Sequence, residues 1–115
     1  MVSPGLMFHM HTTFFLSTET SIDEFRTSLG VFSDFMQDLG LLENTGPVAE
    51  RCKHPIMDTD TEHDHPYFFR MTFRDREQCD AAVKHIQAMQ QESHAIHMAV
   101  YANAVDPVFS CWMDE

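Results

Sequence analysis

Two histidines one residue apart lie near the start of the chain, in the stretch LMFHMHTTFFL that covers residues 6–16. In a β-strand successive side chains alternate between two faces, so His9 and His11 leave the same face. A neutral imidazole near pH 7 can accept or donate a proton, which makes either histidine a candidate general base. The function of the chain depends on what this face contacts.

Four further side chains are expected on the same face of one sheet. Strand alternation puts Arg70 and Thr72 together in YFFRMTFRD, and His97 and Tyr101 together in HAIHMAVYA. Arg70 can hold a carboxylate, phenolate or enolate oxygen, and Tyr101 can orient a hydroxyl group or stack on a ring. Polar groups that converge over aromatic side chains are typical of a small-molecule pocket. The predicted substrate-binding set is His9, His11, Arg70, Thr72, His97 and Tyr101, with no catalytic residue assigned.

The same side chains have two other interpretations. Buried polar groups usually have hydrogen-bond partners without being catalytic, so the set also fits an interface between two subunits. Three imidazoles, from His9, His11 and His97, are suitable ligands for zinc or iron, although H-x-H is by itself a weak signal. The acidic stretch DTDTEHDHP, residues 58–66, lacks the turn glycine and spacing of a calcium loop and is predicted to be a solvated connection. No bound metal is predicted.

No cofactor is predicted either. The chain has only four glycines and no P-loop, G-x-G-x-x-G or G-x-S-x-G motif. Its cysteines, Cys52, Cys79 and Cys111, lie far apart without a C-x-x-C motif. This spacing argues against a disulfide framework and favours a reducing compartment.

Composition limits the partners. The 115 residues are expected to form one domain, 1–115, with seven basic and 18 acidic side chains and a formal net charge of −11. Phosphate backbones and anionic membrane surfaces should repel such a chain, so neither nucleic acid nor membrane is an expected partner. The first residues do not resemble a signal peptide, and no stretch is long enough to span a membrane. A cytoplasmic location is expected.

Two helices are predicted from apolar residues spaced three and four apart. The first follows Ser21, which forms a capping box with Glu24, and ends at Gly40. The second begins at Asp75 to Gln78. Its apolar stripe consists of Cys79, Ala82, Val83, Ile86 and Met89.

Four strands are predicted around these helices. They cover residues 6–16, 48–57, 67–75 and 94–102, and the tail VDPVFSCWMDE, residues 105–115, is a further short extended piece. Pro55 restricts the end of the second strand to an edge or a bulge. The order strand, helix, strand, strand, helix, strand predicts an α+β, ferredoxin-like domain with an antiparallel sheet and both helices on one face. Right-handed crossovers place the first and third strands centrally, with the fourth beside the first and the second beside the third.

The helix-free face is expected to contact a second copy of the chain. It carries aromatic side chains such as Phe15 and Phe68 beside the polar set, so it is too apolar for water and too polar for an ordinary core. A homodimer that packs two such faces together is the predicted partner arrangement.

This element order resembles the dimeric α+β barrel superfamily, whose small ferredoxin-like domains close two sheets into a barrel across a homodimer. Members include cofactor-free monooxygenases of antibiotic biosynthesis, muconolactone isomerase, EthD-like proteins and stress-responsive A/B barrel proteins. The chain is also similar to an uncharacterised bacterial family of small proteins. The resemblance covers nearly the whole chain, rests on element order rather than on a catalytic motif, and implies a cavity at the helix-free sheet face.

The leading hypothesis is therefore a small-molecule-binding protein whose cavity holds an aromatic or anionic organic molecule. Proton transfer or oxygenation, as in a cofactor-free monooxygenase or isomerase, is the chemistry that His and Arg side chains would support there. The first alternative is a non-catalytic structural or regulatory homodimer. The second is a histidine-ligated metalloenzyme.

Overall fold

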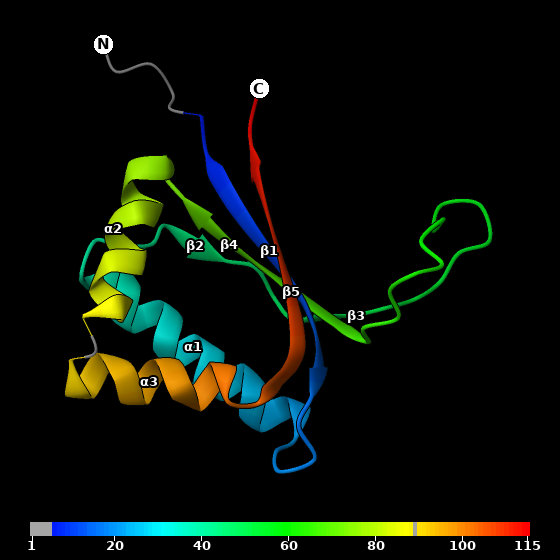
Figure 1. The fold of residues 1–115 in the computed structure, drawn as a ribbon, viewed down its shortest axis with the longest axis horizontal. Helices are drawn as coiled ribbons and strands as arrows, with labels where there is room; N and C mark the ends of the chain where they lie inside the picture. Colours follow the sequence, from blue (N-terminus) through cyan, green and yellow to red (C-terminus); the bar gives the residue numbers. More distant parts are fainter. Residues whose placement is uncertain (1–5, 89) are drawn as a thin grey trace.

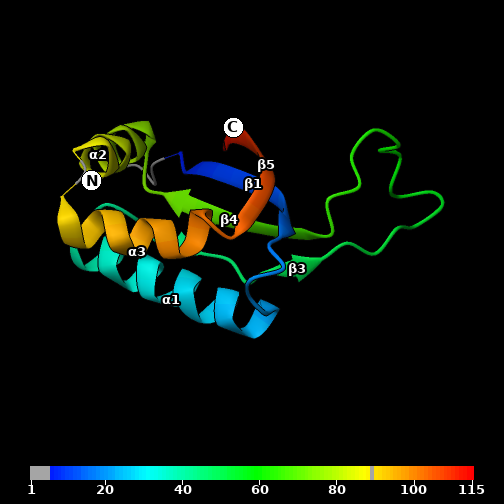
Figure 2. The ribbon, with the colours of Figure 1, turned by 60° about the horizontal axis from the view of Figure 1, so that its bottom comes forward.

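The computed structural model describes residues 6–88 and 90–115, and these form five strands and three helices. The elements are β1 (Phe8–Leu16), α1 (Ile22–Asp38), β2 (Asn44–Thr45), β3 (Ala49–Glu50), β4 (Tyr67–Phe73), α2 (Arg76–Gln87), α3 (Gln91–Tyr101) and β5 (Ala104–Met113). The antiparallel sheet has the order β2-β4-β1-β5, and β3 also pairs with β4 (Figure 1). The helices α1 and α3 lie side by side on one face of the sheet (Figure 2). The predicted α+β, ferredoxin-like class is confirmed.

Both predicted helices, α1 and α2, begin where expected. At each start a side-chain oxygen accepts a hydrogen bond from a backbone N–H group of the first turn. The Ser21 hydroxyl accepts a hydrogen bond from the N–H of Glu24 at 3.1 Å, and the Asp75 carboxylate accepts one from the N–H of Gln78 at 2.8 Å. Gly40 follows α1 with a positive φ of 72°, a conformation that glycine adopts without steric cost. Of the apolar stripe predicted for the second helix, Met89 lies outside the described residues.

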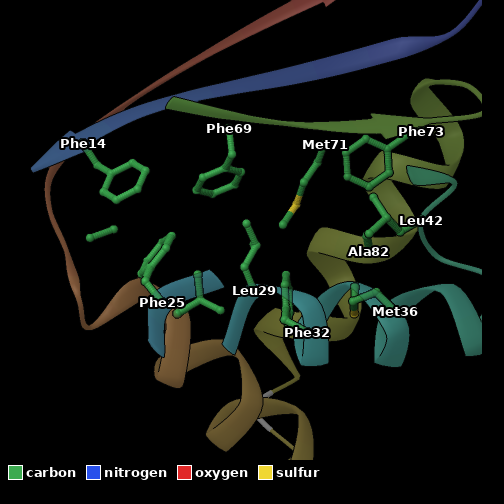
Figure 3. Packing of buried hydrophobic residues seen from close by; sticks show 12 residues of the cluster. Phe14, Phe25, Leu29, Phe32, Met36, Leu42, Phe69, Met71, Phe73 and Ala82 are labelled. Atoms are coloured by element: carbon green, nitrogen blue, oxygen red, sulfur yellow. The ribbon is translucent and has the colours of Figure 1, made fainter. Parts of the chain in front are cut away.

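Strand alternation separates the two faces of the sheet as predicted. Met10 pairs with Met71, and Thr12 with Phe69, in the β1–β4 register. Side chains such as Phe14, Phe69 and Met71 point toward the helices, where they meet Phe25 and Leu29 of α1 (Figure 3). The buried core consists of Phe14, Phe25, Leu29, Phe32, Met36, Leu42, Phe69, Met71, Phe73, Ala82, Val100 and Ala104.

The predicted last strand, residues 94–102, is wrong: this segment lies in the helix α3. The inward face of α3 is formed by residues spaced three and four apart, namely Ser93, Ile96 and Val100. The run HAIHMAVYA is short enough to fit the alternation of a strand as well as this helical spacing. The strand beside β1 is instead β5, formed from the tail that was expected to be only a short extended piece. As an edge strand β5 tolerates Pro107, and the β1–β5 register shifts between Thr13 and Phe15.

The predicted second strand, residues 48–57, is also much shorter than expected. Only Ala49–Glu50 pairs with β4, and Asn44–Thr45 pairs with it further along. Residues 51–66, which we call the arm, project away from the sheet (Figure 1). The arm is closed at its base by a hydrogen bond of 2.7 Å from the N–H of Arg51 to the carbonyl of Pro66.

Candidate functional site

An apolar cleft of about 500 Å³ lies between the sheet and the three helices. We call it the inner cleft. The sheet contributes side chains of β1, β4 and β5, and each helix contributes at least two. Its lining residues are Met10, Phe32, Met36, Leu42, Met71, Phe73, Ala82, Val83, Ile86, Gln87, His97, Tyr101, Pro107 and Phe109. Figure 3 shows several of them, with Phe32, Met71, Phe73 and Ala82 gathered between the sheet and the helices. A volume of this size matches a small organic molecule.

The polar groups of the inner cleft come from α3 and the end of α2. His97 and Tyr101 are one turn apart on α3, with their ring centres 4.7 Å apart, and the His97 ring also meets Phe32 edge-on at 5.7 Å. The Tyr101 hydroxyl lies 4.0 Å from the sulfur of Met71. Gln87 is the third polar residue, and none of the described lining residues is Lys or Arg. The inner cleft therefore offers a few hydrogen-bonding groups within an apolar surface.

Burial sets the protonation of these groups. It lowers the pKa of His97 below 6.5, and the charge of His94 lowers it further. Burial also raises the pKa of Tyr101 above its usual value of 10. At neutral pH, His97 is a neutral imidazole that can accept a proton, and Tyr101 is a hydroxyl that can donate a hydrogen bond. Together they can bind and deprotonate an acidic O–H or C–H group of an otherwise apolar ligand.

The helix-free face carries a second group of polar side chains. The Nδ1 of His9 lies 2.9 Å from the hydroxyl oxygen of Thr72, and its Nε2 lies 2.8 Å from a carboxylate oxygen of Asp114. His11 is paired with Arg70 across the β1–β4 register, and its ring meets Phe68 edge-on at 5.2 Å. Burial, followed by the charge of Arg70 and then that of His9, lowers the pKa of His11.

The predicted substrate-binding set is thus divided between two places. His9, His11, Arg70 and Thr72 lie together on the helix-free face, as the alternation predicted. His97 and Tyr101 do not join them, because residues 91–101 form a helix on the other side of the sheet. The proposed three-histidine metal site is wrong for the same reason. Within residues 6–88 and 90–115, no three His, Cys, Asp or Glu side chains are grouped in a way that could hold a metal ion.

No sequence pattern indicated that a cleft lies between the helices and the sheet. Met10, Met71 and Phe73 line the cleft from the helix-facing side of the sheet, and the pattern of apolar positions is the same for a filled core and for a cleft. The abundance of methionine, nine residues in 115, is compatible with an adaptable binding surface but does not locate it, since of the described methionines only Met10, Met36 and Met71 line the cleft.

Acid is expected to destabilise the protein through His97. Because its folded-state pKa is lowered, the unfolded chain binds more protons below about pH 6.5. The stability contributed by neutral His97 is therefore complete above about pH 6.5 and is lost as the pH falls through the folded-state pKa. Urea unfolding between pH 7 and 5 should show this slope, and His97→Gln should reduce it. His11→Gln should reduce this dependence of stability on pH further, because the pKa of His11 is also lowered. An unchanged pH dependence in His97→Gln would contradict the lowered pKa of His97.

No family model and no curated protein matches this chain. Solved structures do match over nearly the whole length. A dimeric ferredoxin-like protein of unknown function from Thermobifida fusca covers 97% of this chain and 94% of its own at 9% identity, with a TM-score of 0.58. The hydroxynitrile lyase of Passiflora edulis covers 98% and 96% at 6% identity, with a TM-score of 0.63. A point mutant of SnoaB, a cofactor-independent oxygenase from Streptomyces nogalater, covers 96% and 92% at 11% identity, with a TM-score of 0.58.

These similarities show the fold of the chain and confirm the resemblance inferred from its element order. The chain has a ferredoxin-like fold. Among its described residues, no helix is long and apolar enough to cross a membrane.

Proposed function

We propose that this protein binds a small, neutral aromatic molecule in the inner cleft. The observation that carries the proposal is a cleft of about 500 Å³ whose apolar lining contains the partly buried side chains of His97 and Tyr101. Rings of the ligand would pack against Phe32, Phe73 and Phe109, and one hydroxyl or amine group would face His97 and Tyr101. Apolar surface would supply most of the affinity, and the two polar groups would fix the orientation.

The chemistry that this arrangement favours is proton transfer. Neutral His97 would take the proton of a ligand hydroxyl, which leaves an imidazolium and a ligand anion, and the Tyr101 hydroxyl would donate a hydrogen bond to that anion. Two structural neighbours, a hydroxynitrile lyase and a cofactor-independent oxygenase, are enzymes with this fold. Their fold is compatible with catalysis here, while the cleft residues provide the argument for it.

The inner cleft should prefer neutral ligands over anions. No Lys or Arg is among its described lining residues, and the whole chain carries a formal charge of −11. A ligand that enters the cleft already as an anion would lose its hydration and meet a neutral His97, so it would have no cationic partner there. This narrows the sequence-based hypothesis, which allowed an aromatic or an anionic molecule.

A matched pair of fluorescent probes tests the proposal. N-phenyl-1-naphthylamine is neutral, and 8-anilino-1-naphthalenesulfonate has the same ring system with an added sulfonate. We expect saturable binding of the neutral probe and at least about tenfold weaker binding of the sulfonate, because tenfold corresponds to about 1.4 kcal/mol, less than the cost of an unpaired buried charge. Fluorescence titration measures both dissociation constants. Absence of saturable binding by the neutral probe would contradict the proposed function.

We also propose that the chain is a homodimer that packs two helix-free faces together. Trp112 is 60% exposed on this face, which also carries the exposed Val108, and water is a poor environment for such a surface. The fold neighbour from Thermobifida fusca is described as dimeric. In this arrangement His9, His11, Arg70 and Thr72 are interface residues. The alternative role for these four side chains is to bind a ligand. A homodimer without catalytic activity is the second candidate function.

The dimer interface predicts a difference between two adjacent residues of β5. Trp112 and Met113 are 60% and 52% exposed, and they leave opposite faces of the strand. We expect Trp112→Ala to raise the dimer dissociation constant by about 30-fold, the effect of a typical interface tryptophan worth about 2 kcal/mol. Met113→Ala is the matched control and should change it less than threefold. Sedimentation equilibrium measures both, and equal effects of the two variants would contradict the assignment of the interface to this face.

A cytoplasmic location remains part of the proposal. All three cysteines, Cys52, Cys79 and Cys111, are free thiols in the structure. Free cysteines, two of them exposed, are more usual in reducing compartments than outside the cell.

A further inference from the structure

The arm, residues 51–66, is held in a defined shape by its first residue. The guanidinium of Arg51 donates two hydrogen bonds to the Asp58 carboxylate, at 2.7 and 3.0 Å, and one to the carbonyl of Asp60 at 3.0 Å. It also donates to the carbonyl of His63. His65 fixes the returning limb, because its Nε2 lies 2.7 Å from the carbonyl oxygen of Asp106. These hydrogen bonds give the arm an ordered conformation, and it projects away from the sheet (Figure 1).

The tip of this arm presents two apolar side chains to water. Ile56 and Met57 are 77% and 82% exposed, more than any other large apolar residue of the described chain. They sit in a turn in which the Nδ1 of His54 accepts hydrogen bonds from both of their N–H groups, at 3.1 and 3.0 Å. An ordered turn that holds large apolar side chains away from their own core is typical of a contact surface for another molecule.

A second cleft lies between the base of the arm and the helix-free face of the sheet. Its volume is about 700 Å³. The sheet side is lined by Phe68, Val108 and Trp112, and the arm side by Arg51, Asp58 and His63. The cleft is continuous with the surface proposed above as the dimer interface, so a subunit packed on that surface would lie beside the arm.

Charge on the two surfaces is complementary. Arg70 is exposed on the helix-free face and forms no ion pair with any described residue, while its neighbour across the register is His11. The returning limb of the arm carries the exposed acids Glu62 and Asp64. In a two-fold dimer each contact occurs twice. If Glu62 and Asp64 of one copy lie near the partner's Arg70, the same contact therefore forms a second time with the two copies exchanged.

We propose that the arm clasps a second copy of this chain, with Ile56 and Met57 on the partner and the acidic limb toward its Arg70 side. This inference rests on the homodimer of the proposed function and adds the element that secures it. The order already present in the arm reduces the entropy that association would cost, because few residues must be fixed on binding. The arm thus enlarges the interface beyond the sheet faces.

Paired variants test the role of the tip. Ile56→Ser/Met57→Ser should raise the dimer dissociation constant at least tenfold in sedimentation equilibrium, with binding of N-phenyl-1-naphthylamine unchanged. The control is Val31→Ser/Leu39→Ser, which removes two exposed apolar side chains of α1 and the residue after it. If the wild type is a dimer and Ile56→Ser/Met57→Ser has the same dissociation constant, the clasp is overturned and the homodimer is not. A wild-type chain that stays monomeric at every concentration would overturn the homodimer and the clasp together.

A photocrosslink locates the tip directly. Benzoylphenylalanine is placed at position 57, and the labelled chain is mixed with an equal amount of ¹⁵N-labelled chain, so that peptides from two copies differ in mass. We expect crosslinks from position 57 to the partner's residues 67–73 or 104–113. Crosslinks confined to peptides of the same chain would overturn the clasp.

Discussion

Replacing Ala82 with phenylalanine is expected to weaken the binding of N-phenyl-1-naphthylamine by at least about tenfold. Ala82 lies on α2, is 4% exposed and lines the inner cleft near Met71 and Phe73 (Figure 3). Because Ala82 lines the cleft, a ring added at this position would extend into it and occupy volume that the ligand needs. Displacing a ligand from apolar contacts worth about 1.4 kcal/mol already gives tenfold weaker binding. Fluorescence titration gives the dissociation constants of the two proteins.

Ala81→Phe is the matched control, because Ala81 is adjacent on α2 and exposed to solvent. This variant adds the same ring outside the inner cleft and should leave the dissociation constant within twofold of that of the wild type. Thermal unfolding of both variants checks for overpacking, which typically costs about 1–3 kcal/mol. Undiminished binding by a folded Ala82→Phe protein would mean that the probe binds elsewhere.

Truncating Phe69 to alanine is expected to remove about 3–5 kcal/mol from the free energy of unfolding. Phe69 is fully buried at the centre of β4, with its ring centre 5.7 Å from that of Phe14, 6.2 Å from Phe25 and 6.4 Å from Tyr101. The loss combines the transfer of a large apolar side chain with the cavity left behind. A small domain typically has only about 5–15 kcal/mol of stability, so the variant should be close to unfolding at 37 °C.

Urea unfolding at 25 °C measures this change, with Val31→Ala on the exposed side of α1 as the control. The control should stay within about 0.5 kcal/mol of the wild type, as is usual for exposed positions. A loss of less than about 1 kcal/mol in Phe69→Ala would contradict the placement of the ring between the sheet and both α1 and α3.

Much of the fold could be predicted from periodicity and capping. The alternation in residues 6–16 predicted that His9 and His11 share one face of the sheet, and Ser21 predicted the start of α1. Alternation in the sequence matches the tertiary structure here because every second side chain of each strand faces the helices and the others leave the opposite face. The central position of β1 and β4 followed from the handedness of crossovers.

The last third of the chain was harder to predict, and the error moved the candidate site. A nine-residue apolar run such as HAIHMAVYA fits both a strand and one face of a helix, and only tertiary packing decides between them. With α3 in place of a strand, His97 and Tyr101 moved from the helix-free face to the inner cleft. The cleft itself depends on how far α2 and α3 stand from the sheet, and no pattern of residue types encodes that distance.

Histidine NMR tests most directly whether the inner cleft is the ligand site. The chain has eight histidines, which ¹⁵N labelling of the imidazoles makes visible, and His9→Gln, His11→Gln and His97→Gln assign the three that matter. On saturation with N-phenyl-1-naphthylamine we expect the ring signals of His97 to shift and those of His9 and His11 to stay in place. Shifts of His9 and His11 with an unchanged His97 would contradict the inner cleft and assign the ligand to the helix-free face.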